Sequence, residues 1–187
     1  MSKRDGKILS LSGMNVSSEH GGQLHDYFQA NPEKGMHGIG FSAYEEGQEP
    51  GDELSLAQVQ RRMSILKPYV KWVRSFSCIQ GNELIPMVAR QSGLKTLVGA
   101  WLGKDLEKNE LEVEGLIKLA KDGYVDIAAV GNEVMYREDL TEEQLLDYIR
   151  RFKAAVPDVP VGYVDAYYEF EDRPAITDIC DVILANC

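Results

Sequence analysis

Residues 127–134 have the sequence Ile-Ala-Ala-Val-Gly-Asn-Glu-Val, which contains an apolar run followed by two polar side chains. A short, continuously apolar run is typical of a strand that is buried on both faces, as strands of parallel sheets are. We therefore predict a strand over residues 127–131. It presents Asn132 and Glu133 at its carboxyl end.

Units of the same kind lie on both sides of this strand. Apolar runs predict further strands over residues 39–42, 72–77, 96–101, 161–165 and 182–186. Helical patterns lie between them, at residues 55–68, 82–91, 109–120, 141–152 and 174–180. The strands begin at intervals of about 20–35 residues, as repeated βα units require.

Polar pairs mark where three of these helices begin. We predict capping boxes for Ser55 with Gln58 and for Thr141 with Gln144, and a cap made by Asn109 with Glu112. Acidic runs at residues 45–46, 107–114 and 138–143 are predicted to be solvated faces and helix-start charges, which the helix dipole favours.

Right-handed βα repeats form either a closed barrel or an open, doubly wound sheet. The glycine-rich phosphate fingerprint of the doubly wound sheet is absent, since the first strand leads into Ser-Ala-Tyr-Glu-Glu-Gly. Polar residues instead cluster at the carboxyl ends of successive strands, where a barrel has its active site. We predict an α/β fold, a TIM-type (β/α)8 barrel that is incomplete, with six strands in 187 residues. Residues 1–36 are predicted to be a polar arm or tag remnant, and residues 37–187 the partial barrel catalytic domain.

Composition limits the function classes. The chain has 20 Lys and Arg against 30 Asp and Glu, a net charge of −10, which argues against nucleic-acid and anionic-membrane partners. The three cysteines have no metal-ligand spacing, and no apolar stretch approaches the roughly 18 residues of a membrane helix. No signal peptide is visible, which predicts a cytoplasmic protein as written, or a secreted or periplasmic one if a signal has been removed.

The Asn132–Glu133 pair is the strongest candidate for chemistry. A carboxylic acid at the mouth of a largely apolar barrel can keep a proton available for a leaving oxygen, and the neighbouring amide can hydrogen-bond a sugar hydroxyl. The alternative is that Glu133 is simply the first solvated residue after a buried strand.

Several stretches of the chain resemble glycoside hydrolase family 17, the β-1,3-glucanases and related bacterial enzymes. The resemblance extends over roughly residues 38–187 and depends on GIGFSAY at 38–44, GQ at 47–48, PG at 50–51, VRSFS at 73–77, VGAWL at 98–102, VGNEV at 130–134, YR at 136–137 and ILAN at 183–186.

The resemblance implies a retaining double displacement on β-1,3-glucan, with two carboxylates about 5–5.5 Å apart and no metal or organic cofactor. Glu133 matches the acid/base, and Asn132 matches the residue that contacts the sugar held by the nucleophile. The family's nucleophilic glutamate follows strand seven, to which nothing here corresponds; Glu169, Glu171 and Asp172 do not match its motif. The resemblance thus implies a truncated barrel whose isolated chain has little or no glycosidase activity.

Five more strand-end residues are candidate substrate contacts. Aromatic faces stack on the apolar surface of sugar rings, and a buried Arg is costly unless it is paired. A strand-end Asp either orients a neighbour or faces water. The candidates are Tyr44, Arg74, Trp101, Tyr136 and Asp165.

Three functions remain open at this stage. The chain is the N-terminal part of a β-1,3-glucan hydrolase, a transglycosylase of the same type, or a non-catalytic glucan-binding or assembly fragment. The partner in each case is a β-glucan oligosaccharide or polysaccharide. The unpaired edges of the first and sixth strands also predict self-association, or a complementing C-terminal segment.

Overall fold

A computed structural model describes residues 35–186 of the chain. The arm predicted over residues 1–36 lies almost entirely outside the described residues. Six strands form one sheet: β1 (Met36–Gly40), β2 (Val70–Ser75), β3 (Lys95–Ala100), β4 (Ile127–Asn132), β5 (Val161–Ala166) and β6 (Val182–Asn186). Between them come α3 (Leu56–Leu66), η2 (Lys67–Tyr69), α4 (Leu84–Gln91), α5 (Leu106–Lys121), α6 (Glu142–Ala155), α7 (Tyr167–Glu171) and α8 (Pro174–Ile179).

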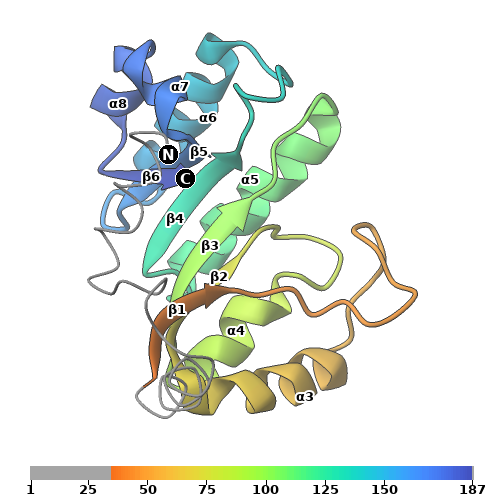
Figure 1. Cartoon of the computed structure of the whole chain (residues 1–187). Coiled ribbons are helices and arrows are strands. Elements are labelled where there is room, and N and C mark those ends of the chain that lie inside the picture. The colour runs from red at the N-terminus through yellow and green to blue at the C-terminus, as the bar shows by residue number, and fades with distance from the viewer. Residues whose placement is uncertain (1–34, 187) are drawn as a thin grey trace, which may run out of the picture. The chain divides into compact units, whose positions relative to one another are not determined.

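The strands are parallel and neighbour one another in chain order, from β1 to β6 (Figure 1). A doubly wound sheet reverses its strand order partway, whereas a (β/α) barrel does not. The sheet is therefore an open half-barrel that matches part of a TIM barrel, which confirms the predicted fold class.

The strands lie close to their predicted positions. Residues 182–186 agree with β6, whereas β1 and β2 begin and end earlier than predicted. Residues 76 and 77 leave the ladder after β2, and the hydroxyl of Ser77 donates instead to Glu112. Helix α7 lies between the predicted strand at 161–165 and the predicted helix at 174–180, where the sequence predicted neither a helix nor a strand.

The first residues of three helices show which of the predicted caps form. The capping box of Thr141 with Gln144 is confirmed. Ser55 Oγ accepts from Gln58 N over 3.3 Å, but the Gln58 side chain donates to Ala43 O over 2.7 Å, so this box is half formed. Helix α5 begins at Leu106 with Asp105 as its cap, so the predicted cap by Asn109 and Glu112 is wrong.

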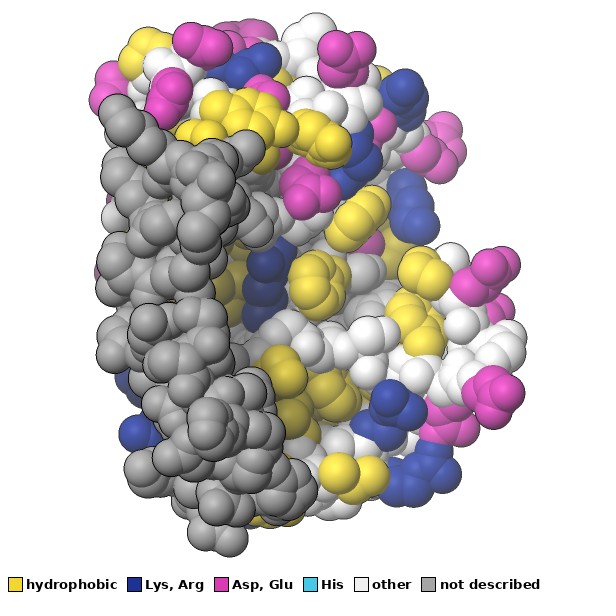
Figure 2. Space-filling model, in the orientation of Figure 1, with side chains coloured by type: hydrophobic (Ala, Val, Ile, Leu, Met, Phe, Trp, Pro, Cys, Tyr) yellow, Lys and Arg dark blue, Asp and Glu magenta, His cyan; other side chains and the backbone are white. Residues whose placement is uncertain are grey.

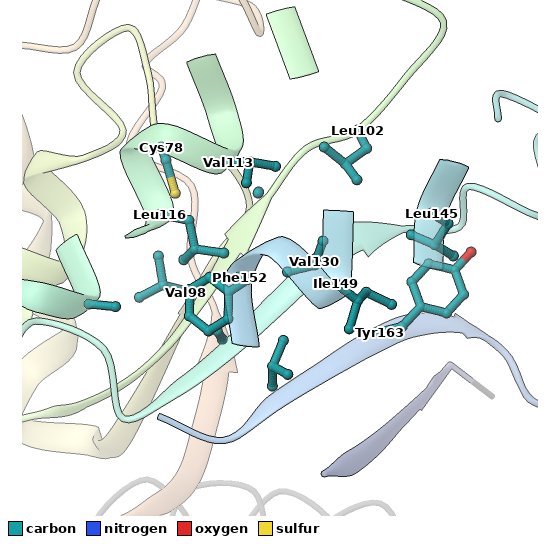
Figure 3. Close-up of a cluster of buried hydrophobic side chains, with 14 of the residues drawn as sticks. Cys78, Val98, Leu102, Val113, Leu116, Val130, Leu145, Ile149, Phe152 and Tyr163 are labelled. Atoms are coloured by element: carbon teal, nitrogen blue, oxygen red, sulfur yellow. The ribbon is translucent and has the colours of Figure 1, made fainter. Parts of the chain in front are cut away.

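The larger core lies where α5 and α6 pack on β3, β4 and β5 (Figure 3). Val98 and Val130 from the sheet are fully buried there, as are Leu116, Ile149 and Phe152 from the helices. Burying each such side chain stabilises the fold by about 1.5–3 kcal/mol. A second cluster, which includes Val59, Met63, Val73, Ile85 and Val88, joins α3 and α4 to β2.

The two edge strands and the inner face are open. Among residues 35–186, β1 and β6 each have a single neighbour in the sheet, and β1 is exposed at all of its positions. Arg74, Leu97 and Ile127 line a hollow of about 340 Å³ on the sheet. Figure 2 shows one hollowed face, where hydrophobic and Lys or Arg side chains meet. Self-association or complementation through the edges stays a prediction.

Candidate active site

The carboxyl end of β4 is bent by a bulge. The register between β4 and β5 shifts between Ala129 and Asn132, and Gly131 and Glu133 have φ angles of +88° and +53°. A Cβ on Gly131 would lie 2.9 Å from Val134 Cγ2, so both the angle and the space require glycine. Glu133 is not glycine, and such left-handed residues concentrate at functional sites.

The side chain of Glu133 is directed toward β6. It is half-buried, and Asn186 Nδ2 donates to its Oε1 over 2.7 Å. Its backbone N–H donates to Val164 O over 2.7 Å, which ties the bulge to β5. Glu133 is therefore held from β5 and β6, and its acid/base role stays a prediction.

Asn132 is held from β2. Arg74 Nη2 donates to Asn132 Oδ1 over 2.6 Å, and the Arg74 guanidinium lies 4.6 Å from the ring centre of Phe76. Burial lowers the pKa of Arg74, while the charge of Glu133 acts in the opposite direction. The predicted residues Arg74, Asn132 and Glu133 thus come together across β2 and β4.

Arg137 is a rim residue that we quoted only within a matched stretch and assigned no role. Its guanidinium lies 4.7 Å from the ring centre of Trp101 and donates to Asn132 O over 2.5 Å and to Leu102 O over 3.0 Å. It therefore joins the end of β3 to the end of β4. Two signals in the sequence pointed to Arg137: its place four residues after Glu133 and the matched stretch at 136–137.

The structure corrects the prediction that Asp165 contacts the substrate. Its side chain is fully buried, and its Oδ2 accepts from the Tyr163 hydroxyl, from Met135 N over 3.2 Å and from Tyr136 N over 3.3 Å. A fully buried side chain cannot touch a substrate, so Asp165 orients the loop after β4 instead. Burial and the hydrogen bond to Asp165 raise the pKa of Tyr163. Tyr136 itself is 57 % exposed at the rim.

A cavity of about 350 Å³ lies at the carboxyl ends of β1, β2 and β3. Tyr44 and Trp101, both predicted contacts, line it together with Phe41, Phe76 and Glu112. Asn82 Nδ2 donates to the Tyr44 hydroxyl over 3.0 Å and fixes that ring. Glu112 was predicted to lie on a solvated face, which is wrong because it is fully buried.

Two kinds of feature are absent from residues 35–186. This part of the chain holds no group of three or more His, Cys, Asp or Glu side chains that could bind a metal ion. Nor does it contain a helix long and apolar enough to span a membrane. The absence of a cofactor stays a prediction.

Polar side chains at the carboxyl rim of a (β/α) barrel are the arrangement in which barrel enzymes hold their active sites. Residues 38–187 match the BtgE/BtgC glycoside hydrolase domain, and the chain belongs to this family. The resemblance to glycoside hydrolase family 17 is confirmed.

Curated relatives are glucan 1,3-beta-glucosidases. The protein from Arthroderma benhamiae is 26 % identical over 125 residues, covering 64 % of this chain and 40 % of that protein. Glucan 1,3-beta-glucosidase BGL2 of Candida albicans is 28 % identical over 142 residues, covering 66 % of this chain and 46 % of that protein. The chain thus spans less than half the length of these two relatives.

Solved structures agree on the fold. The glycoside hydrolase family 17 beta-1,3-glucanosyltransferase of Rhizomucor miehei superposes with a TM-score of 0.69 at 24 % identity, covering 83 % of this chain and 58 % of that chain. An active-site mutant of that enzyme, in complex with laminaritriose, gives the same values.

Proposed function

We propose that this chain is part of a retaining glycoside hydrolase that acts on β-1,3-glucan, with Glu133 as the acid/base. The observation that carries the proposal is the position of Glu133, half-buried at the barrel rim and held by Asn186 over 2.7 Å. The family, the glucan 1,3-beta-glucosidase relatives and the laminaritriose complex support β-1,3-glucan as the substrate class.

The proposed chemistry starts with a proton from Glu133. The glycosidic C–O bond breaks as the leaving sugar oxygen takes this proton, while a second carboxylate attacks the anomeric carbon from the opposite face. Glu133, now ionised, then takes a proton from water or from a sugar hydroxyl as that oxygen bonds to the anomeric carbon and the bond to the second carboxylate breaks. Water gives hydrolysis, and a sugar hydroxyl gives transfer. In this proposal Asn132, whose Oδ1 accepts from Arg74 Nη2, hydrogen-bonds the sugar through its amide nitrogen.

The second carboxylate has no candidate among the acids named from the sequence. Glu169 is ion-paired with Arg173, and Glu171 and Asp172 are exposed. We therefore propose that the 187-residue chain, tested alone, binds β-1,3-glucan with little or no turnover. The similar fold of a glucanosyltransferase supports transglycosylation as the second candidate function.

The first test measures laminaritriose binding and turnover by the parent chain and by Glu133→Gln. Chromatography separates shorter products, which indicate hydrolysis, from longer ones, which indicate transfer. We expect binding by both proteins and, where the parent shows turnover, its loss in Glu133→Gln, because an amide cannot donate a proton as an acid does. Turnover that survives the substitution rejects the role of Glu133, and absence of binding rejects the glucan.

A second test separates an enzyme part from a binding fragment. Phenyl β-laminaribioside has a poor leaving group, and azide can take the place of a carboxylate nucleophile. A bond forms between azide and the anomeric carbon, the C–O bond breaks, and phenol leaves with the proton of Glu133. Azide-dependent phenol release that Glu133→Gln abolishes supports the enzyme, and no release by either protein supports the binding fragment.

A further inference from the structure

Helix α5 carries a buried acid that the proposed chemistry does not use. Glu112 is fully buried, and its side chain forms part of the wall of the 350 Å³ cavity that Tyr44 and Trp101 line. A carboxyl group removed from water costs several kcal/mol unless hydrogen bonds compensate, so its partners show what it holds in place.

Those partners belong to the loop after β2. Ser77 Oγ donates to Glu112 Oε1 over 2.5 Å, and Cys78 N donates to Oε2 over 2.7 Å. Both oxygens are thus engaged by consecutive residues of one loop. Ser77 also lines the cavity, so Glu112 determines where this wall of the cavity lies.

Asn109, one turn earlier on α5, does the same for the loop after β3. Its Oδ1 accepts from Gly103 N over 2.8 Å and its Nδ2 donates to Gly103 O over 2.7 Å. Trp101, 38 % exposed, is two residues before Gly103 and lines the cavity. One helix therefore fixes two of the loops that line the cavity, the loop after β2 and the loop after β3.

The balance of charge at Glu112 supports a positioning role. Burial raises its pKa, whereas hydrogen bonds from the Ser77 side chain and from the backbones of Cys78 and Trp101, together with the charge of Lys108, act in the opposite direction. A protonated carboxyl can donate to Ser77 Oγ while still accepting from Cys78 N. A glutamine amide reproduces this pattern, and an aspartate, which is one methylene shorter, cannot reach both partners.

We infer that Glu112 is a positioning residue that holds Ser77 and Trp101 in place to bind a glucose unit of the glucan in this cavity. The inference rests on the proposed function, because the ligand is the same β-1,3-glucan. The aromatic rings supply the faces on which a sugar ring stacks, and the loops that Glu112 and Asn109 hold set the width between them.

The test is calorimetric titration of laminaritriose into the full chain and its variants. We expect Glu112→Ala to weaken affinity about tenfold or more, as loss of two buried hydrogen bonds does. Glu112→Asp is expected to weaken it in the same direction, and Glu112→Gln to stay within about threefold of the parent. Glu112→Asp keeps the test valid should Glu112→Ala fail to fold.

A matched control separates positioning from general loss of stability. Ile149→Ala on α6 removes a fully buried side chain from the core, at a position that does not line the cavity. It is expected to lower the melting temperature and leave the affinity unchanged. Equal affinity of the parent, Glu112→Asp and Glu112→Ala overturns this inference but leaves the proposed function standing. A loss of affinity in Ile149→Ala as large as that in the Glu112 variants does the same. No binding by the parent overturns the proposed function and this inference together.

Discussion

Asn186, the last residue of β6, donates through Nδ2 to Oε1 of Glu133 over 2.7 Å, although 53 residues separate the two in the chain. The contact crosses the end of β5 and joins the open edge of the half-barrel to its candidate acid. A residue at the edge of the sheet thus orients the group on which the proposed chemistry depends.

We predict that Asn186→Ala lowers the free energy of unfolding by about 1 kcal/mol, since one half-buried hydrogen bond is lost. Asn186→Asp is expected to cost more than Asn186→Ala, because its carboxyl oxygens put acceptors where Glu133 Oε1 now receives a donor. Urea unfolding of the parent and both variants measures the difference. Equal stability of the parent and Asn186→Asp would show that the two side chains are not in contact in solution.

Removing the Tyr163 hydroxyl is expected to destabilise the loop after β4. This hydroxyl donates to the buried Asp165 and accepts from Met135 N over 2.9 Å, so Tyr163→Phe leaves both with fewer partners. We expect a loss of about 1–3 kcal/mol in urea unfolding. Tyr167→Phe, at a side chain that is 48 % exposed, is the control and is expected to change stability by less than about 0.5 kcal/mol. Equal effects of the two substitutions contradict the role given to Tyr163.

Gly131→Ala is predicted to destabilise the protein by about 1–3 kcal/mol, because φ is +88° and the added Cβ meets Val134 and Tyr163 side-chain atoms at 2.9 and 3.2 Å. Gly103→Ala is the matched control, since nothing lies within 4 Å of its added Cβ. Denaturant unfolding of both variants checks the difference. A cost for Gly103→Ala as large as that for Gly131→Ala refutes the assignment of strain to the bulge.

The buried Glu112 predicts a pH dependence of stability. Its pKa is raised above the usual 4.5, so the folded state holds its proton at pH values where the unfolded state has released it. Its stabilising contribution is therefore complete below that usual value and is lost as the pH rises through the raised pKa. Glu112→Gln cannot titrate and should lack this decline.

The measurement compares the unfolding free energy of the parent and Glu112→Gln at several pH values from 4 to 8. We expect the parent to lose stability relative to Glu112→Gln over this range. A constant difference between them shows that folding does not shift the pKa of Glu112, and a parent that gains relative stability as the pH rises shows a lowered pKa.

Much of the fold could be predicted from local pattern. The apolar run before Asn132 predicted β4, and Thr141 with Gln144 predicted the start of α6, since strand burial and helix capping each depend on a few consecutive residues. The start of α5 could not be placed, because both Asp105 and Asn109 are residues that can cap a helix. Packing then decided that Asn109 is buried inside the helix.

The sequence by itself determined the βα order, the barrel class and the place of Asn132 and Glu133 at a strand end, because backbone hydrogen bonding and burial impose short periods on the chain. Only the tertiary structure decided which polar side chains are buried and what they hold. Glu112 meets Ser77 across 35 residues, and Asp165 meets the backbone of Met135 across 30. Such pairings depend on how helices and strands pack in space. No local pattern distinguishes a solvated acid from a buried acid that accepts hydrogen bonds from residues far away in the chain.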